Sequence, residues 1–378
     1  MVEWKKLGEV CVSLRKEIIK QGDLKDDGKY PVVNSGITLY GYYDDYNNEA
    51  NAFTVASRGE YAGFITYMND NFWAGGLCYP YRSKNESICL TKYMYSYLKN
   101  KERYIMDTLV MRGGIPALNK ADVDKILIPI PSLSEQQRIV SILDTFTSSI
   151  SNLKQQIEER RKQYEYERDL LLDLEGKEGV EMKKLGEVFD TRNGYTPSTK
   201  NPDFWEEGTI PWFKMEDIRD NGRVLGDSNL HITPKAIKGK GLFKANSIIL
   251  ATSATIGEHA LITVEHLSNQ RFTNFYPKKK FEGLINMKFV YYYMYLIDEW
   301  CKQHINQGGF ASVDMNGLFS MDFPLLSLQA QSRIVSILDT FEQSISNLEE
   351  QLAMREKQYE YYRNQLLTFE GEEERGKT

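Results

Sequence analysis

Apolar residues in two segments of the chain recur at spacings of three and four positions, the pattern of a helix with one buried stripe. Neither segment, residues 133–175 or residues 328–370, contains Gly or Pro. At 1.5 Å per residue, a helix of about 42 residues is roughly 60 Å long. The stripe, called the seam below, consists of Ile139, Ile142, Phe146, Ile150, Leu153, Ile157, Tyr164 and Leu171 in the first segment and of Ile334, Ile337, Phe341, Ile345, Leu348, Leu352, Tyr359 and Leu366 in the second.

The two helical segments are copies of each other. At an offset of 195 positions, residues 133–172 and 328–367 are identical at 26 of 40 positions without a gap. A second repeated sequence, KKLGEV, lies near the start of the region that precedes each helix. The chain is therefore an internal duplication, and we expect a first block at 1–132, a first helix segment at 133–178, a second block at 179–326, a second helix segment at 327–372 and a tail at 373–378.

Each seam needs a partner, and the duplicated seam supplies one within the chain. An antiparallel pair is the natural geometry, because the first helix ends where the second block begins. This arrangement predicts a pseudo-twofold molecule with its blocks at opposite ends. The alternative is a parallel coiled coil that dimerises the protein. Arg160 and Arg355 occupy matching seam positions, where they either fix the register or lie at a solvated edge.

Cap residues indicate where both helices begin and end. Ser134 and Ser327 are the expected N-caps, and Gly176 and Gly371 are the expected stops.

The two blocks have the pattern of α+β domains. Short strand-like runs such as NAFTVAS and SIILATSA are separated by Gly, Asn and Asp turns. A tyrosine-rich helix is expected in each block, at residues 91–100 and 287–302. Each block then ends in a Gly-Gly loop, an apolar strand and a Pro, with Gly113-Gly114 matching Gly308-Gly309.

Charge is distributed unevenly along the chain. The net charge of −6 argues against a nucleic-acid partner, but the acidity lies in the helical segments (−3 and −4), whereas the blocks are near neutral (+1 and 0). Charge therefore neither supports nor excludes DNA binding. The four cysteines are scattered without a CxxC pair, the apolar runs are too short to cross a bilayer, and charges interrupt the N-terminal residues where a signal peptide would be apolar. We expect a cytoplasmic protein with reduced thiols and no membrane contact.

Motifs for catalysis are missing from the sequence. It contains no P-loop and no FxGxG methyl-donor motif. Asn201-Pro202-Asp203-Phe204 resembles the NPPF loop of adenine methyltransferases but lacks the second Pro, so a turn is the better interpretation. The four histidines are isolated, all in the second half. We expect no catalytic, cofactor-binding or metal-binding residue in this chain.

Polar side chains interleaved with aromatic residues in turns suit nucleic-acid reading instead. Arg and Lys bond guanine edges, and Asn and Gln pair with adenine in the major groove. The same residues could also bind phosphate or carbohydrate, or cap turns. The candidate DNA-binding residues are Ser57, Arg58, Gly59, Tyr61, Arg82 and Arg112 in the first block and Asn193, Tyr195, Thr196, Lys214, Ser253, Thr255, Gln270, Arg271 and Lys279 in the second.

The order of block, LSEQQRIVSILD helix, block and repeated helix resembles the specificity subunit of type I restriction–modification enzymes. Further similarities are the KKLGEV openings, the stretch from Tyr195 to Ile218, SATIG at 253–257 and SNQRF at 268–272. Together they cover essentially the whole chain. The first block departs from the pattern, since SRGEYAG replaces SATIG there; the loop from Ser57 to Gly63 is taken as its counterpart.

The resemblance implies a non-catalytic subunit with two target recognition domains, each reading one half of a bipartite asymmetric site in double-stranded DNA. It implies that the paired helices set the spacer and dock two modification (methyltransferase) subunits, and that restriction subunits join the complex. S-adenosylmethionine, ATP and Mg are then expected on the partner subunits, with no cofactor in this chain. Two alternatives stay open: the specificity subunit of a DNA methyltransferase without a restriction partner, and a coiled-coil scaffold with two protein-binding heads.

Overall fold

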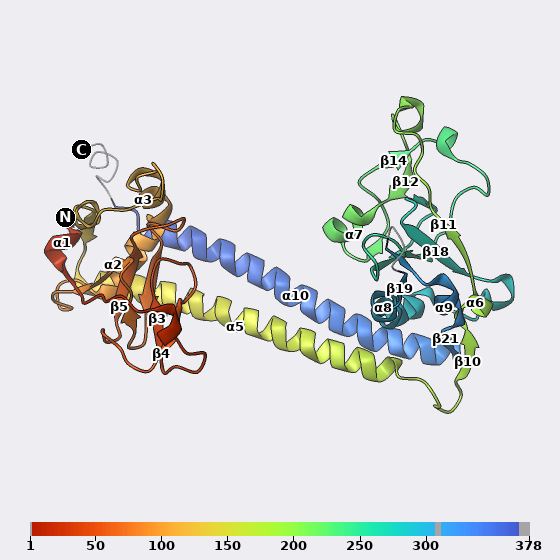
Figure 1. The fold of residues 1–378 in the computed structure, drawn as a ribbon, viewed down its shortest axis with the longest axis horizontal. Helices are drawn as coiled ribbons and strands as arrows, with labels where there is room; N and C mark the ends of the chain where they lie inside the picture. Colours follow the sequence, from red (N-terminus) through yellow and green to blue (C-terminus); the bar gives the residue numbers. More distant parts are fainter. Residues whose placement is uncertain (1, 307–310, 370–378) are drawn as a thin grey trace. The chain divides into compact units, whose positions relative to one another are not determined.

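The computed structural model describes residues 2–306 and 311–369, which form two compact units. Unit 1 comprises the described residues of Met1–Gln155 and Glu349–Thr378, and unit 2 comprises Gln156–Leu348. Two long helices, α5 (Leu133–Leu172) and α10 (Leu328–Leu366), each contribute one part to unit 1 and the other part to unit 2 (Figure 1).

Within each unit the two long helices pack side by side and antiparallel. In unit 1, the ring of Phe146 lies 6.3 Å from that of Tyr359, and Lys154, further along α5, pairs with Glu356, which is earlier in α10, at 2.9 Å. In unit 2, the ring of Tyr164 lies 6.3 Å from that of Phe341. All sixteen seam residues are buried or half-buried. The predicted antiparallel pair within one chain is confirmed.

The two seam arginines make equivalent contacts. The guanidinium of Arg160 lies 5.9 Å from the ring centre of Phe341 in unit 2, and that of Arg355 lies 5.7 Å from the ring centre of Phe146 in unit 1. Both arginines are half-buried. A guanidinium over an aromatic face gains a cation–π interaction, so each arginine contributes to the pairing rather than lying at a solvated edge.

One predicted helix cap is wrong by two positions. Helix α5 begins at Leu133, and the hydroxyl of Ser132, not Ser134, accepts the amide of Glu135 at 3.3 Å. Ser132 precedes the first helical residue, where a side-chain oxygen can reach the third amide of the helix. The prediction for Ser327 is confirmed, because its hydroxyl accepts the amide of Ala330 at 3.2 Å. Gly176 follows α5 with φ +71°, whereas Gly371 lies outside the described residues.

The head of unit 1 is built from one four-stranded sheet and two smaller sheets. Their strand orders are β2-β8-β5-β6, β4-β3-β7 and β1-β9. The strands are β1 (Glu3–Lys6), β2 (Cys11–Ser13), β3 (Tyr30–Val33), β4 (Gly41–Tyr43), β5 (Ala52–Ala56), β6 (Ile65–Met68), β7 (Trp73–Ala74), β8 (Cys78–Ser83) and β9 (Leu127–Ile130). The helices are α1 (Leu7–Val10), α2 (Thr91–Asn100), α3 (Glu102–Thr108), α4 (Lys120–Asp124) and the 3-10 turn η1 (Gln21–Asp23).

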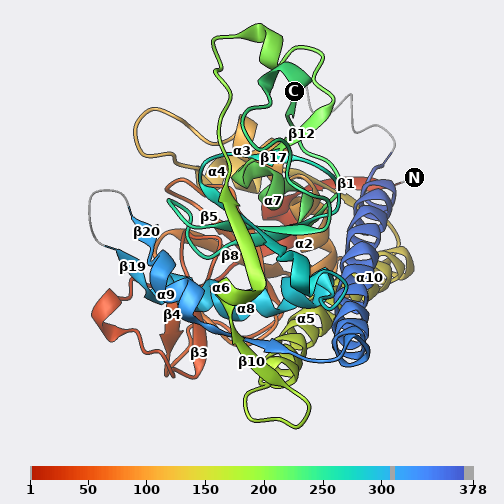
Figure 2. The ribbon, with the colours of Figure 1, turned by 90° about the vertical axis from the view of Figure 1, so that its right-hand side faces the viewer.

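The head of unit 2 has one five-stranded sheet and three smaller ones. Their orders are β11-β18-β15-β16-β13, β14-β12-β17, β10-β21 and β19-β20. The strands are β10 (Glu181–Lys184), β11 (Phe189–Asn193), β12 (Ile210–Phe213), β13 (Val224–Leu225), β14 (His231–Ile232), β15 (Ser247–Ala251), β16 (His259–Ile262), β17 (Leu267–Ser268), β18 (Phe272–Pro277), β19 (Ile305–Asn306), β20 (Ser312–Val313) and β21 (Asp322–Leu325). The helices are α6 (Leu185–Val188), α7 (Met215–Asn221), α8 (Met287–Gln303), α9 (Met315–Ser320) and the 3-10 turns η2 (Pro202–Phe204), η3 (Pro234–Ala236) and η4 (Lys279–Phe281). Figure 2 brings this unit to the front, with β12 and β17 towards one end and α8 and β10 towards the other.

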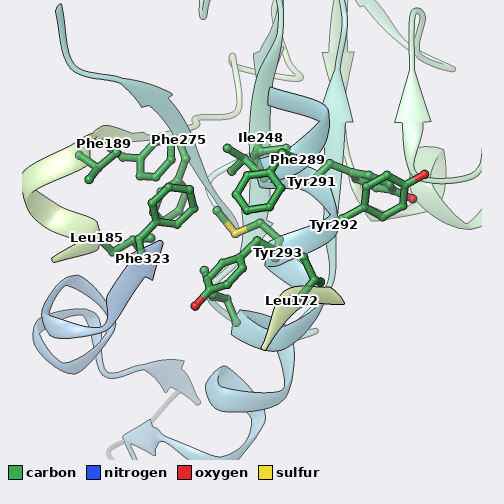
Figure 3. Packing of buried hydrophobic residues seen from close by; sticks show 14 of the residues in the cluster. Leu172, Leu185, Phe189, Ile248, Phe275, Phe289, Tyr291, Tyr292, Tyr293 and Phe323 are labelled. Carbon is green, nitrogen blue, oxygen red and sulfur yellow. The ribbon is translucent and has the colours of Figure 1, made fainter. Parts of the chain in front are cut away.

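The main core of unit 2 forms where α8 packs against the five-stranded sheet. Phe289 and Tyr292 of α8 are fully buried, as are Ile248 and Phe275 of the sheet (Figure 3). Leu172, the last residue of α5, is buried in the same cluster, which ties the long helix to the head. The tyrosine-rich helices expected in the blocks are α2 and α8, and both supply core residues.

The repeated KKLGEV sequence forms the same structure in both units. Trp4 pairs with Pro129 between β1 and β9, and Met182 pairs with Pro324 between β10 and β21. A Cβ on Gly8 would lie 3.2 Å from Asp124, and one on Gly186 would lie 3.1 Å from Phe319. The glycine of the motif thus permits the close approach of α1 to α4 and of α6 to α9. The predicted α+β fold with two similar blocks and two long helices is confirmed.

A buried glutamine near the start of each long helix joins the helix to its head. Gln136 is fully buried: its side-chain oxygen accepts the amide of Leu90 at 2.9 Å, and its side-chain nitrogen donates to the carbonyls of Ile88 and Pro131 at 2.9 Å. Gln331 repeats this arrangement in unit 2.

In the second joint the amide of Asn286 donates to Gln331 at 2.7 Å, and Gln331 donates to the carbonyls of Leu284 and Leu326 at 2.9 and 2.8 Å. Both glutamines bond only main-chain atoms, so this joint, the glutamine clamp, does not depend on which side chains the head presents.

Candidate nucleic-acid interface

The loops of unit 2 that carry most of the candidate residues meet at one edge of the five-stranded sheet. Strand β15 ends at Ala251 opposite Phe272, and β11 ends at Asn193 opposite Thr273. The ends of β11 and β15 therefore lie on either side of the start of β18. We call residues 193–196, 252–257, 268–271 and 311–313 the loop edge of unit 2.

Hydrogen bonds join the loops of this edge. The amide of Tyr195 donates to the carbonyl of Ser268 at 2.8 Å, and the amide of Thr252 donates to the carbonyl of Arg271 at 3.0 Å. The hydroxyl of Thr196 donates to the side-chain oxygen of Gln270 at 2.5 Å. The loops are therefore held as one surface.

The corresponding edge of unit 1 consists of residues 57–63 and 111–118. Arg58 forms a β-bridge with Ala117, and the amide of Gly59 donates to the carbonyl of Pro116 at 2.9 Å. The hairpin carrying Gly113-Gly114 is thus bonded to the loop from Ser57 to Gly63. Its counterpart at Gly308-Gly309 lies outside the described residues.

The two loop edges share one backbone scaffold. The amide of Leu118 donates to the carbonyl of Ser57 at 2.9 Å, and the amide of Val313 donates to that of Thr252 at the same distance, an offset of 195 for donor and acceptor alike. The bridge of Arg58 to Ala117 has its equivalent in the bridge of Ser253 to Ser312.

The left-handed residues of these loops correspond as well. Gly59 (φ +92°) matches Ala254 (φ +66°), and Gly63 (φ +94°) matches Gly257 (φ +77°) after a deletion of one residue. The amides of Gly63 and Gly257 donate to the carbonyls of Ala56 and Ala251; these two acceptors are again 195 positions apart, whereas the donors are 194 apart. The loop from Ser57 to Gly63 is therefore the structural counterpart of the SATIG loop, as its sequence position predicted.

Several candidate side chains are exposed on these edges. Arg58 and Arg271 are exposed, and neither makes a side-chain hydrogen bond or ion pair with another described residue. Tyr61 is 36% exposed, and Ser253 and Thr255 are half-buried in the loop after β15. These residues are open to an approaching ligand, and their contacts with DNA stay a prediction.

Other candidates have structural partners. The hydroxyl of Tyr195 donates to the carbonyl of Ala236 at 3.0 Å, and the amide oxygen of Asn193 accepts the hydroxyl of Thr273 at 2.9 Å. Arg112 donates to the carbonyl of Met106 at 3.3 Å. Lys214 precedes α7, directly after Phe213, whose carbonyl accepts the amide of Asn269.

Arg82 and Lys279 are not brought to the loop edges. Strand β8 meets the edge at Cys78, which pairs with Ala56, and Arg82 lies four residues further along, where it donates to the carbonyls of Glu49, Ala50 and Asn51. Lys279 follows the opposite end of β18 from the edge. The sequence alone does not indicate at which end of the sheet these residues lie.

A buried histidine, His266, precedes the loop at 268–271. The ring nitrogens of His266 lie 3.0 Å from the carbonyl of Val264 and 3.0 Å from the amide oxygen of Asn274. Burial lowers the pKa of His266 to about 4, so the ring is neutral at physiological pH. His266 therefore adds no positive charge next to the loop edge.

Two exposed lysines next to the loop edge were missed in the sequence. Lys238 and Lys240 alternate with Gly239 and Gly241, and the amide of Lys238 donates to the hydroxyl of Tyr195 at 2.8 Å. The alternation of Lys and Gly was the available signal.

Other classes of site have little support among the described residues. No group of three His, Cys, Asp or Glu side chains within residues 2–306 and 311–369 is placed to hold a metal ion. The four cysteines are buried and free, and burial raises the pKa of Cys78 and Cys301 to about 12. None of the helices in these ranges combines the length and apolar character that a membrane span requires.

Relatives of known class resemble this chain. The specificity subunit of the type I restriction enzyme EcoprrI from Escherichia coli is 48% identical over a match that spans 52% of this chain and 52% of that protein. Another type I restriction enzyme specificity subunit from Escherichia coli is 32% identical and covers 97% of this chain and 94% of its own length. The match with the first relative thus spans about half of each protein, whereas the second extends over nearly all of both.

A solved structure has the same fold. The type I restriction–modification S subunit from M. genitalium superposes with a TM-score of 0.64 at 18% identity and covers 97% of both chains. The HsdS subunit from Thermoanaerobacter tengcongensis gives a TM-score of 0.52, also at 18% identity.

A family model also matches this chain twice, at residues 1–160 and 177–354. Each match contains one block, its loop edge and most of the following helix. The repeated scaffold seen in the two units is thus the repeat of the family itself, and the chain belongs to the family of the type I restriction modification DNA specificity domain.

Proposed function

We propose that this chain is the non-catalytic reading subunit of a type I restriction–modification complex, and that each loop edge reads one half of a bipartite site in double-stranded DNA. The observation that carries the proposal is one loop scaffold, repeated at an offset of 195, that presents different side chains in the two units. Arg58 stands in unit 1 where Ser253 stands in unit 2. A guanidinium and a hydroxyl favour different base edges, so the two edges read different sequences.

The chemistry of the complex belongs to partner subunits in this proposal. Two modification subunits bring S-adenosylmethionine and methylate adenine after flipping it out of the duplex. Restriction subunits with ATP and Mg add DNA cleavage. The single test is methylome sequencing of cells that express this chain with its modification subunits. A bipartite methylated motif that disappears when this chain is omitted is the expected result; methylation without such a motif would exclude a reading role.

The exposed arginines of the loop edges should each determine one base position. Replacing Arg58 or Arg271 with Ala should cost about 1–3 kcal/mol of DNA binding and relax one position, each in a different half of the motif, because a bidentate guanine contact is lost. The methylome of each variant gives the result.

Lys177→Ala is the matched control, since it removes one positive charge from the exposed linker between α5 and β10. An unchanged motif and methylation rate in both arginine variants would remove these two residues from the interface.

The long helices should set the length of the spacer, the unspecified base pairs between the two half-sites. A seven-residue insertion after Lys154, matched by one after Glu349, lengthens each helix by about 10 Å and keeps the seam in phase within about 20°. The Lys154–Glu356 pair of unit 1 is preserved, because both insertions lie beyond it. The spacer should grow by up to about three base pairs at roughly 3.4 Å each, with both half-sites unchanged.

A matched insertion of four residues in each helix is the control for the seven-residue insertion. It turns the seam by about 40°, so this variant should be the less active of the two. Methylome sequencing reads the spacer directly. If the seven-residue variant is active and its spacer keeps the wild-type length, the helices do not set the distance.

A further inference from the structure

Two lysines in unit 2 are left without a charge partner, although their neighbours in sequence are paired. Segment 235–244 contains four lysines. The ammonium of Lys235 lies 3.2 Å from the carboxylate of Asp203, and that of Lys244 lies 2.7 Å from that of Glu282. Lys238 and Lys240 between them are exposed, and neither side chain bonds to any residue within 2–306 or 311–369. Two free positive charges therefore lie two positions apart on one short loop.

The glycines of this loop serve its backbone conformation rather than its packing. Gly239 has φ +59° and Gly241 has φ +79°, the left-handed region that glycine adopts without strain. A Cβ on either residue would meet nothing within 4 Å. The loop therefore turns twice around Lys240 and holds it on an open surface.

One end of the loop is anchored to Tyr195 of the loop edge, and the other end is anchored to β11, the strand that leads into this edge. The hydroxyl of Tyr195 accepts the amide of Lys238 at 2.8 Å and donates to the carbonyl of Ala236 at 3.0 Å. Arg192 on β11 donates to the carbonyl of Gly241 at 2.8 Å. Because the next residue after Tyr195, Thr196, bonds to Gln270, the lysine loop is continuous with the loop edge through two adjacent residues.

We infer that Lys238 and Lys240 bind the phosphodiester backbone of the DNA whose bases the loop edge of unit 2 reads; this inference rests on the proposed function. An ammonium group is a compact point charge suited to a phosphate oxygen. Phosphate contacts set the position of a protein on the duplex without reading its sequence. In a chain with a net charge of −6, unpaired lysines next to a reading surface are where such contacts can form.

The test compares two double variants that remove the same charge from the same segment. Lys238→Ala with Lys240→Ala removes the free lysines, and Lys235→Ala with Lys244→Ala removes the paired ones. The full-length chain assembled with its modification subunits is titrated with a labelled random-sequence duplex between 50 and 200 mM KCl, and fluorescence anisotropy gives the affinity.

Two lost phosphate contacts should make the slope of log K against log salt shallower by about 1.8, because each contact contributes about 0.9. Over this fourfold salt range the affinity of the free-lysine variant should then fall about 12-fold less than that of the wild type. The paired-lysine variant should keep the wild-type slope, and both variants should keep the wild-type methylated motif.

Other outcomes overturn the inference in distinguishable ways. An unchanged slope in the free-lysine variant, or an equal change in both variants, shows that the two lysines contact no phosphate. Loss of assembly with the modification subunits in the absence of DNA, seen by gel filtration, assigns the lysines to an acidic protein surface instead. If the wild-type complex shows no sequence-dependent methylation, the proposed function itself fails, whatever the slopes are.

Discussion

Exchanging residues 183–326 for the equivalent block of another specificity subunit should change one half of the methylated sequence and leave the other half intact. The structural reason is that the two junctions of the exchange lie next to each other. Strand β10 pairs with β21, so that Lys183 lies opposite Phe323 at the base of the head. The block therefore leaves and re-enters the shared framework at one point, and its core lies within unit 2.

Methylome sequencing of the exchanged chain gives the result. The reciprocal exchange of residues 1–132 is the matched control and should alter only the other half of the motif. A simultaneous change in both halves after a single exchange would mean that the two heads form one composite reading surface.

Replacing either clamp glutamine with Ala should lower the free energy of unfolding by about 3 kcal/mol or more. The substitution removes three hydrogen bonds and the packing of a fully buried side chain, and a buried group left without its partner costs about 1–3 kcal/mol. Urea unfolding of the full chain measures the stability. Hydrogen exchange locates the damage, because the amide of Leu90 should exchange faster in Gln136→Ala and that of Asn286 in Gln331→Ala.

Neighbouring residues on the same helices provide the controls. Gln137 and Gln329 are exposed, so Gln137→Ala and Gln329→Ala should change stability by less than about 0.5 kcal/mol. Gln136→Met fills a similar volume without the hydrogen bonds and separates their loss from the loss of packing. Wild-type exchange at Leu90 and Asn286 in the alanine variants would show that the clamp does not hold the heads.

The repeated helices and the type of fold could be predicted from the sequence because both depend on local patterns. Seam spacing marks a helix wherever it occurs, and 26 identical positions out of 40 reveal the duplication without any structure. The runs around Phe53 and Ile249 were expected to be strands for a similar reason, and both lie in β5 and β15.

The composition of the interface could be predicted only in part, because it depends on which end of a strand faces the ligand. Arg82 and Arg58 lie in similar polar surroundings in the sequence, yet only Arg58 is at the loop edge. The role of Gln136 could not be predicted from the apolar seam, because that pattern does not mark a buried polar side chain. Its presence in both copies of the helix, 195 positions apart, was the usable signal.

The glutamine clamp has a consequence for how such a protein acquires new targets. Each clamp recognises one main-chain N–H and two main-chain carbonyls, which an unrelated head can supply if it keeps the same turn before its tyrosine-rich helix. A gene segment encoding a different head can therefore recombine into this framework without compensating mutations in the helix. New DNA specificity then arises in one genetic step, and the two long helices are inherited unchanged.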